Sequence, residues 1–163
     1  METRLNYQRA HFDFDALGSL TSPRRALGLE AVALGLIKLQ AGAGYSFTHH
    51  HAAQEEVYIV IEGAGEMVVD GELLGLARGD VVRVPAPARR ALRAAEDSSL
   101  FAICAGATPA GFPRDPKARY LIDDGVPHYD DLPPWCADDP EAEARNAELA
   151  ARAERAAARR RAE

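Results

Sequence analysis

The stretch 44–63 reads GYSFTHHHAAQEEVYIVIEG: three consecutive histidines, then two glutamates, then an apolar run that ends in glycine. In an extended strand, side chains two residues apart lie on the same face. His49 and His51 therefore point together, and His50 points to the opposite face. Two imidazoles on one face are a common start of a site for a divalent transition metal.

A carboxylate could complete such a site. Glu56 has the opposite sequence parity from His49 and His51, so a continuous strand would carry its side chain to the other face. We therefore expect residues 52–54 to turn and reset the alternation before the apolar run continues as a strand. With that turn, the two imidazoles and one carboxylate form a candidate set of metal ligands.

The spacing of this stretch resembles the first motif of the cupin superfamily, which has a glycine, His-x-His, a short spacer, Glu, six residues and Gly. His49, His51, Glu56 and Gly63 match the motif, and Gly44 lies one residue closer to the histidines than the pattern has it. The resemblance implies an all-β fold, a double-stranded β-helix or jelly-roll barrel.

The second cupin motif is matched only in part, at 79–94, GDVVRVPAPARRALRA. Gly79 and Pro85 fall on their positions, but Arg90 stands where the family has its third histidine ligand. Arginine cannot ligate a metal, and a cation beside one opposes metal binding. Two interpretations stay open: Arg90 turns out to solvent and leaves a coordination position open, or its guanidinium binds a carboxylate or phosphate of a ligand.

Other residues of the expected barrel interior are aromatic or apolar. Tyr58 shares parity with Glu56 and should lie beside it, either as a hydrogen-bond donor or acid toward a substrate or as a core residue with a satisfied hydroxyl. Phe47, Met67 and Phe101 are predicted to line the cavity without taking part in chemistry.

The rest of the chain reads as short strands punctuated by turns, followed by one helix. Two of these strands are predicted at 57–61 and 66–69, separated by the glycines of residues 63–65. Asp70-Gly71 is a strong two-residue hairpin signal. Asp139-Pro140 provides a helix cap and a proline suited to the first turn. We expect these units: an N-terminal arm at 1–26, the cupin barrel at 27–105, an irregular wrapping segment at 106–137, and a C-terminal α-helix at 138–163.

Composition narrows the possible functions. The 163-residue chain has a formal net charge of −6, which argues against general nucleic-acid binding. Its two cysteines give no disulfide framework. No segment resembles a signal peptide or a membrane span, so we expect a cytoplasmic protein. The family resemblance adds an expectation of a homodimer.

Two functional hypotheses follow. In the first, His49, His51 and Glu56 hold a divalent iron, zinc, manganese or nickel ion, and Tyr58 and Arg90 orient a small polar or anionic molecule. The resemblance then implies an enzyme of the dioxygenase, isomerase, decarboxylase or lyase type. In the second, the same pocket is a metal-free, non-catalytic module that binds or senses a small metabolite.

Overall fold

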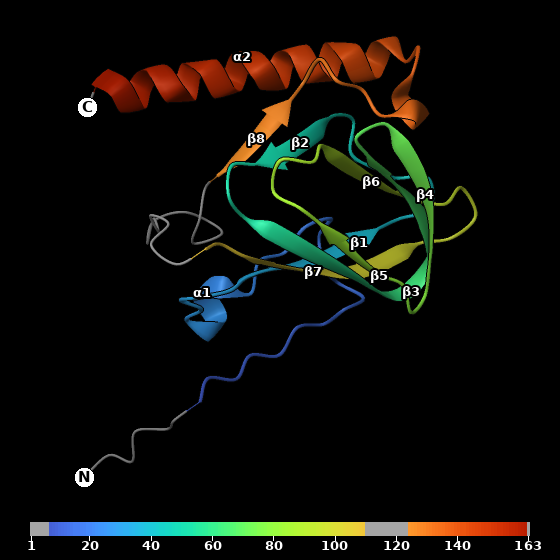
Figure 1. Cartoon of the computed structure of the whole chain (residues 1–163), viewed down its shortest axis with the longest axis vertical. Helices are drawn as coiled ribbons and strands as arrows, with labels where there is room; N and C mark the ends of the chain where they lie inside the picture. Colours follow the sequence, from blue (N-terminus) through green and yellow to red (C-terminus); the bar gives the residue numbers. More distant parts are fainter. Residues whose placement is uncertain (1–6, 110–123, 163) are drawn as a thin grey trace.

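The computed structural model describes residues 7–109 and 124–162, which form a curled, two-layered β-barrel with a long C-terminal helix beside it (Figure 1). The strands are β1 Ala33–Leu39, β2 Thr48–His51, β3 Glu55–Val69, β4 Glu72–Ala77, β5 Val81–Val84, β6 Arg90–Ala94, β7 Leu100–Ala107 and β8 Gly125–His128. The helical elements are α1 Arg24–Leu27, the 3-10 turn η1 Pro134–Cys136 and α2 Pro140–Ala162. The all-β barrel with a C-terminal helix confirms the fold predicted from the motifs.

The long strand β3 belongs to both layers of the barrel. Its first part pairs with β7 and β5, and β7 pairs in turn with β1. Its second part pairs with β4 and β6, and β6 continues to β2 and β8. The sequence predicted two separate strands here, divided at residues 63–65. The structure corrects this prediction, because β3 keeps its antiparallel partners on both sides of the bend.

Glycine is required at the bend of β3 because neighbouring backbone comes very close. Gly63 has φ +78°, and a Cβ built on it would lie 1.7 Å from the carbonyl oxygen of Ser99. A Cβ on Gly65 would lie 2.2 Å from the carbonyl oxygen of Arg93. The last glycine of the first motif therefore allows one strand to pass from one layer to the other.

The predicted hairpin at Asp70-Gly71 is confirmed. Val69 of β3 faces Glu72 of β4 across this two-residue turn. Both turn residues have positive φ, 48° at Asp70 and 85° at Gly71. This is the backbone twist that suits a tight connection between antiparallel strands.

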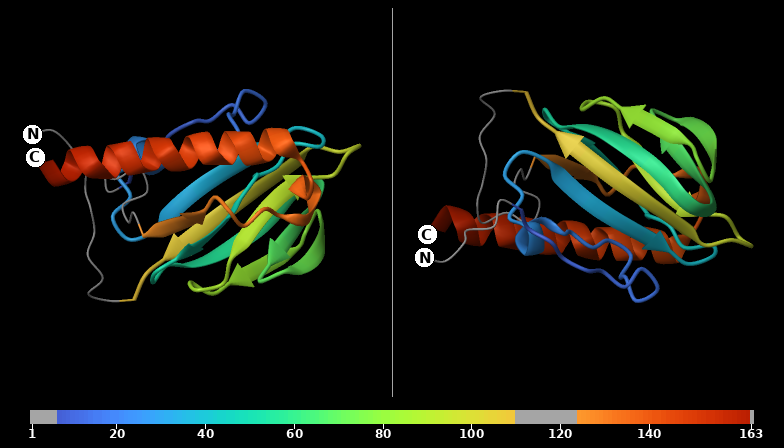
Figure 2. Two further views of the ribbon diagram at one scale, coloured as in Figure 1. Left: turned by 90° about the horizontal axis from the view of Figure 1, so that it is seen from above. Right: turned by 90° about the horizontal axis from the view of Figure 1, so that it is seen from below.

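The C-terminal helix α2 begins at the predicted cap and docks through its first turns. The carboxylate of Asp139 accepts hydrogen bonds from the backbone amides of Glu141 and Ala142, at 2.9 and 3.2 Å. Asn146, 1% exposed, accepts from the hydroxyl of Ser46 at 2.6 Å and donates to the carbonyl of the same residue at 2.7 Å. The second half of the helix extends past the barrel (Figure 2). Within residues 7–109 and 124–162, no helix combines the length and apolar character needed to cross a bilayer.

Candidate metal centre

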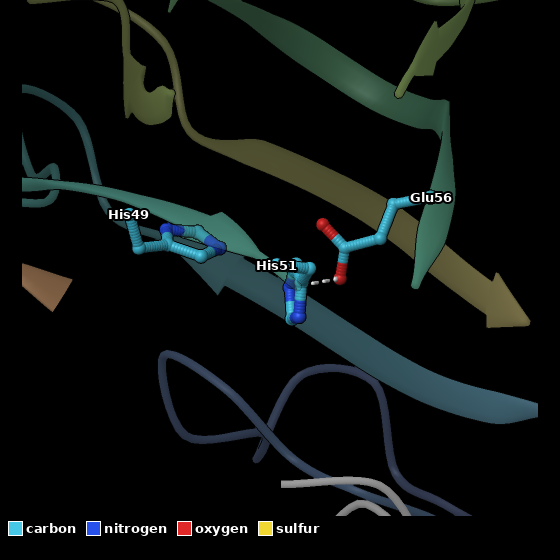
Figure 3. A group of neighbouring side chains, drawn as sticks. All are labelled: His49, His51 and Glu56. Atoms are coloured by element: carbon cyan, nitrogen blue, oxygen red, sulfur yellow. Dashed lines mark ion pairs between the residues drawn. The ribbon is translucent and has the colours of Figure 1, made fainter. Parts of the chain in front are cut away.

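The three residues singled out by the sequence converge at one end of the barrel. His49 and His51 project from β2, and Glu56 projects from the first part of β3 in the other layer (Figure 3). One ligand atom from each lies within 4.8 Å of the other two. The chain leaves strand geometry at residues 52–54, as predicted, so Glu56 turns back toward the imidazoles.

Both nitrogens of His51 face carboxylates. Its Nδ1 lies 2.7 Å from Oδ1 of Asp124, and its Nε2 lies 3.2 Å from Oε1 of Glu56. The Nε2 atom is buried and has no hydrogen-bond partner among the described residues. If Nδ1 carries the proton donated to Asp124, Nε2 presents its lone pair beside the Glu56 carboxylate. Two facing sets of lone pairs are favourable when a cation lies between them, so the residues fit a divalent metal.

The Glu56 carboxylate is the most heavily contacted group of the site. Tyr58 donates its hydroxyl to Oε2 at 2.7 Å, and Gln54 donates its amide to Oε1 at 3.2 Å. Burial alone would raise the pKa of Glu56, but the neighbouring His51, the Tyr58 hydroxyl and the charge of Arg90 together lower it to about 2. Glu56 is therefore an anion at neutral pH.

Two neighbouring groups, His49 and Tyr58, have protonation states that suit metal binding. Burial, assisted by the charges of Arg90 and His51, lowers the pKa of His49 to about 4, so its imidazole is neutral at pH 7 with a lone pair available. Burial, together with the neighbouring Cys104 and Glu56, raises the pKa of Tyr58 well above its usual range. The phenol therefore stays protonated, and its hydroxyl donates to Glu56 rather than acting as a base. Burial lowers the pKa of His51, but Glu56 and Asp124 outweigh burial and raise this pKa above its usual value, so a metal would compete with a proton at that imidazole.

Arg90 is buried, with 1% of its surface exposed. Its Nη1 donates to the carbonyls of Ala88 at 2.8 Å and Ala86 at 3.3 Å, and its Nη2 lies 3.4 Å from Oε2 of Glu56. The interpretation that Arg90 turns out to solvent is therefore wrong. A buried guanidinium needs acceptors and a counter-charge. Here two carbonyls accept from Nη1 and Glu56 supplies the counter-charge, whereas Nε and Nη2 have no hydrogen-bond partner among the described residues.

A cavity of about 250 Å³ opens beside the three candidate ligands. It is lined by Leu20, Ala33, Leu34, Gly35, Ile37, Tyr45, His49, His51, Gln54, Glu56, Tyr58, Cys104, Gly106 and Gly125. Its polar groups gather at the histidine end, and residues of β1 make much of the remaining wall apolar. Among the described residues, no lysine or arginine lines it, and Arg90 lies behind Glu56 rather than in the wall.

The three predicted wall residues lie elsewhere, so that prediction was wrong. Met67 is buried in the core, Phe47 packs on Tyr129 with ring centroids 4.7 Å apart, and Phe101 packs on Phe14 at 4.8 Å. Phe101 lies on the face of β7 opposite to Leu100 and Cys104, which belong to the core cluster. Met67 does belong to that cluster, but sequence parity gives only the face of a strand. It does not say how far along the barrel axis the cavity extends.

Sequence reasoning missed residues that the barrel brings to the site from a distance. Asp124 lies 73 residues beyond His51 and carries no motif. Cys104 of β7 pairs in register with Tyr58 and lines the cavity. Gln54 was noticed only as part of the turn. Its position between the histidines and Glu56 is the one local signal that could have identified it.

Comparison with known proteins is consistent with this geometry. A family profile described as "Cupin domain" matches residues 35–106, which run from within β1 to within β7. The chain carries a cupin domain. The cupin resemblance read from the two motifs is therefore confirmed, and the match ends before Asp124.

Solved structures support the same assignment. A cupin protein from Bacteroides fragilis is 27% identical with a TM-score of 0.60, and the alignment covers 73% of this chain and 98% of that one. The DMSP lyase DddQ from Ruegeria pomeroyi is 25% identical with a TM-score of 0.50, covering 68% of this chain. The cupin described here spans only 57% of the lyase's length. No curated protein matches the sequence at a significant level.

Proposed function

We propose that this cupin binds a divalent metal ion through His49, His51 and Glu56 and acts on a small molecule held in the adjoining cavity. The observation that carries the proposal is the buried, unpartnered Nε2 of His51, which faces the Glu56 carboxylate with His49 beside it. Two imidazoles and one carboxylate suit iron, zinc, manganese or nickel.

A bound ion of this kind would polarise an oxygen of the ligand or activate water or oxygen. The protein's own residues prepare the site before any ion arrives. His49 is neutral and Glu56 is anionic at pH 7, so neither must lose a proton to become a ligand. Tyr58 and Gln54 hold the carboxylate from the side and limit its rotation.

The cavity favours a compact ligand with an apolar body and one polar or anionic group. At about 250 Å³ it lies below the roughly 300–1,000 Å³ of pockets for drug-sized ligands. The polar group would face His49 and Glu56, and the body would lie against Leu34 and Ile37 of β1. The sequence predicted a small polar or anionic molecule, and the apolar wall of the cavity narrows this class to molecules that also carry an apolar body. Because Arg90 already contacts Glu56 and two carbonyls, a direct contact between Arg90 and the ligand would require its side chain to move.

A second candidate function, a metal-free binding module, has one observation in its favour. Arg90 supplies a positive charge 3.4 Å from Glu56, and Tyr58 and Gln54 donate to the same carboxylate. Glu56 therefore has a counter-ion and hydrogen-bond donors without a metal. In this reading the cavity holds a small metabolite and no reaction follows.

Metal content separates the two functions. Untagged wild-type protein and the His49→Ala/His51→Ala variant are analysed by plasma mass spectrometry after reconstitution with iron, zinc, manganese or nickel. His50→Ala is the matched control, because His50 lies on the same strand but its ring stacks on His128, away from the candidate ligands.

Near-stoichiometric metal in the wild type and in His50→Ala, lost in the double variant, supports the metal-dependent function. Oxygen-consumption and lyase screens then follow, the latter prompted by the similarity to the DMSP lyase. Absence of metal from the wild type after every reconstitution refutes the metal-dependent function. The metal-free module is then the better description, and ligand screening with small carboxylic acids and alcohols replaces the activity screens.

A further inference from the structure

A carboxylate from outside the matched cupin region reaches into the candidate metal centre. Asp124 directly precedes β8, beyond residues 35–106, and is 8% exposed. Its Oδ1 lies 2.7 Å from Nδ1 of His51. Its Oδ2 accepts the backbone N–H groups of Ala53 and Gln54, at 2.9 and 2.8 Å. The same carboxylate therefore holds the imidazole and the turn that brings Glu56 back to the histidines.

We propose that Asp124 is the positioning residue of this centre, and that it holds His51 with the proton on Nδ1 and the lone pair of Nε2 directed at the metal position. The inference rests on the metal-binding function proposed above. Carboxylates bonded to the far nitrogen of a ligating histidine fix its tautomer and ring orientation, and their loss typically weakens metal binding about 10–100-fold.

The bonding pattern around Asp124 requires two acceptor oxygens. Two backbone N–H groups donate to Oδ2, so Oδ1 alone is left for the imidazole. An asparagine offers one acceptor oxygen and one NH₂ group. If its oxygen keeps the two backbone bonds, its NH₂ group faces Nδ1 of His51 and can only donate. The imidazole must then carry its proton on Nε2. In that tautomer Nε2 has no free lone pair and cannot bind the metal.

The strand that follows Asp124 supports its placement. Gly125, the first residue of β8, pairs with His51 in antiparallel register and lines the cavity. A Cβ on Gly125 would lie 3.5 Å from Cε1 of the His51 ring, so the β8 backbone packs directly against that imidazole. The chain beyond the matched cupin region thus forms part of the site.

The test compares Asp124→Asn with Asp131→Asn. Asp131 lies in the same C-terminal segment and accepts a hydrogen bond from Thr48 of the same strand β2, at 2.5 Å, but it touches none of the candidate ligands. Zinc affinity is measured by competition with a chromophoric chelator. We expect an approximately 10–100-fold loss in Asp124→Asn and no loss in Asp131→Asn. Thermal melts of the metal-free proteins show whether each variant folds.

A second readout needs neither metal nor activity. Long-range ¹H–¹⁵N spectra of metal-free protein, recorded where the ring is neutral, report which His51 nitrogen carries the proton. We expect the Nδ1–H tautomer in the wild type and the Nε2–H tautomer in Asp124→Asn. An Nε2–H tautomer in the wild type overturns the inference even if the variant fails to fold. Unchanged zinc affinity in a folded Asp124→Asn protein overturns it as well. If the wild type binds no metal, the proposed function fails, while the tautomer still decides whether Asp124 orients His51.

Discussion

His49 of β2 lies directly opposite Arg90 of β6 in antiparallel register, at the position where the cupin pattern has its third histidine. The Arg90 guanidinium points toward Glu56, with Nη2 3.4 Å from Oε2. A cation therefore takes the place of a ligand, in contact with a residue proposed to bind metal. The site is left with two histidines and one carboxylate on the cavity side.

Replacing Arg90 with histidine should tighten metal binding. The change removes a positive charge next to Glu56 and offers an imidazole opposite His49. Like charges about 4 Å apart repel by roughly 4 kcal/mol at an effective dielectric constant of 20, so we expect affinity to rise by at least about tenfold, or about 1.4 kcal/mol. Zinc affinity of the wild type and Arg90→His, measured with a competing chelator, checks this. Equal or weaker binding would show that Arg90 does not oppose the metal.

Removing the charge of Arg90 without adding a ligand should destabilise the metal-free protein. Arg90→Met leaves the Glu56 carboxylate buried without its counter-ion, and breaking a buried ion pair typically costs about 3–5 kcal/mol. Arg83→Met is the matched control. Arg83 pairs with Glu55 at the exposed surface, where such pairs contribute about 0–1 kcal/mol.

Urea unfolding of the metal-free proteins measures how much each substitution, Arg90→Met and Arg83→Met, lowers the free energy of unfolding. Added zinc should recover more stability in Arg90→Met than in the wild type, because the ion replaces the missing positive charge. Equal stabilities of Arg90→Met and Arg83→Met would contradict the role of Arg90 as the counter-ion of Glu56.

The metal-free protein should lose stability as the pH falls from 6.5 to about 4. Burial lowers the pKa of His49 from 6.5 to about 4, so in this window the unfolded chain binds a proton that the folded chain does not. The stability that neutral His49 contributes is present in full above pH 6.5. The free energy of unfolding falls by on the order of 3 kcal/mol by the time the pH reaches about 4. Glu56, whose pKa is lowered from 4.5 to about 2, extends the loss below pH 4.5.

Urea unfolding at a series of pH values checks this prediction. The His49→Gln variant should show a shallower slope between pH 6.5 and 4.5 than the wild type. The exposed His11 provides the control, since His11→Gln should keep the wild-type slope. A His49→Gln profile parallel to the wild type would show that His49 does not govern acid sensitivity in this range.

Gly63→Ala should destabilise the barrel by more than about 1 kcal/mol, because alanine is strained at φ +78° and its Cβ would meet the Ser99 carbonyl. Gly75→Ala on β4 is the control, since a Cβ there meets nothing within 4 Å and its φ is not in the positive range. Thermal melts give the melting temperatures of the two variants and of the wild type for comparison. A Gly63→Ala protein as stable as Gly75→Ala would mean that β3 can bend without glycine.

Local features of this fold were predictable from the sequence. The alternation of strand side chains placed His49 and His51 together and His50 apart, and the turn at residues 52–54 brought Glu56 to them. Asp70-Gly71 predicted the hairpin for the same reason: each of these features depends on the backbone geometry of a few consecutive residues.

The residues that contact the candidate ligands were decided by how the two layers of the barrel close. Sequence parity could not tell whether Arg90 faces solvent, a ligand or Glu56, because the answer depends on the distance between β6 and β3. Asp124 reaches His51 across 73 residues of chain, and no local rule relates the two positions. The sequence alone determined which residues could bind a metal. The closed barrel decided which charges surround them, because electrostatic contacts depend on separation in space rather than along the chain.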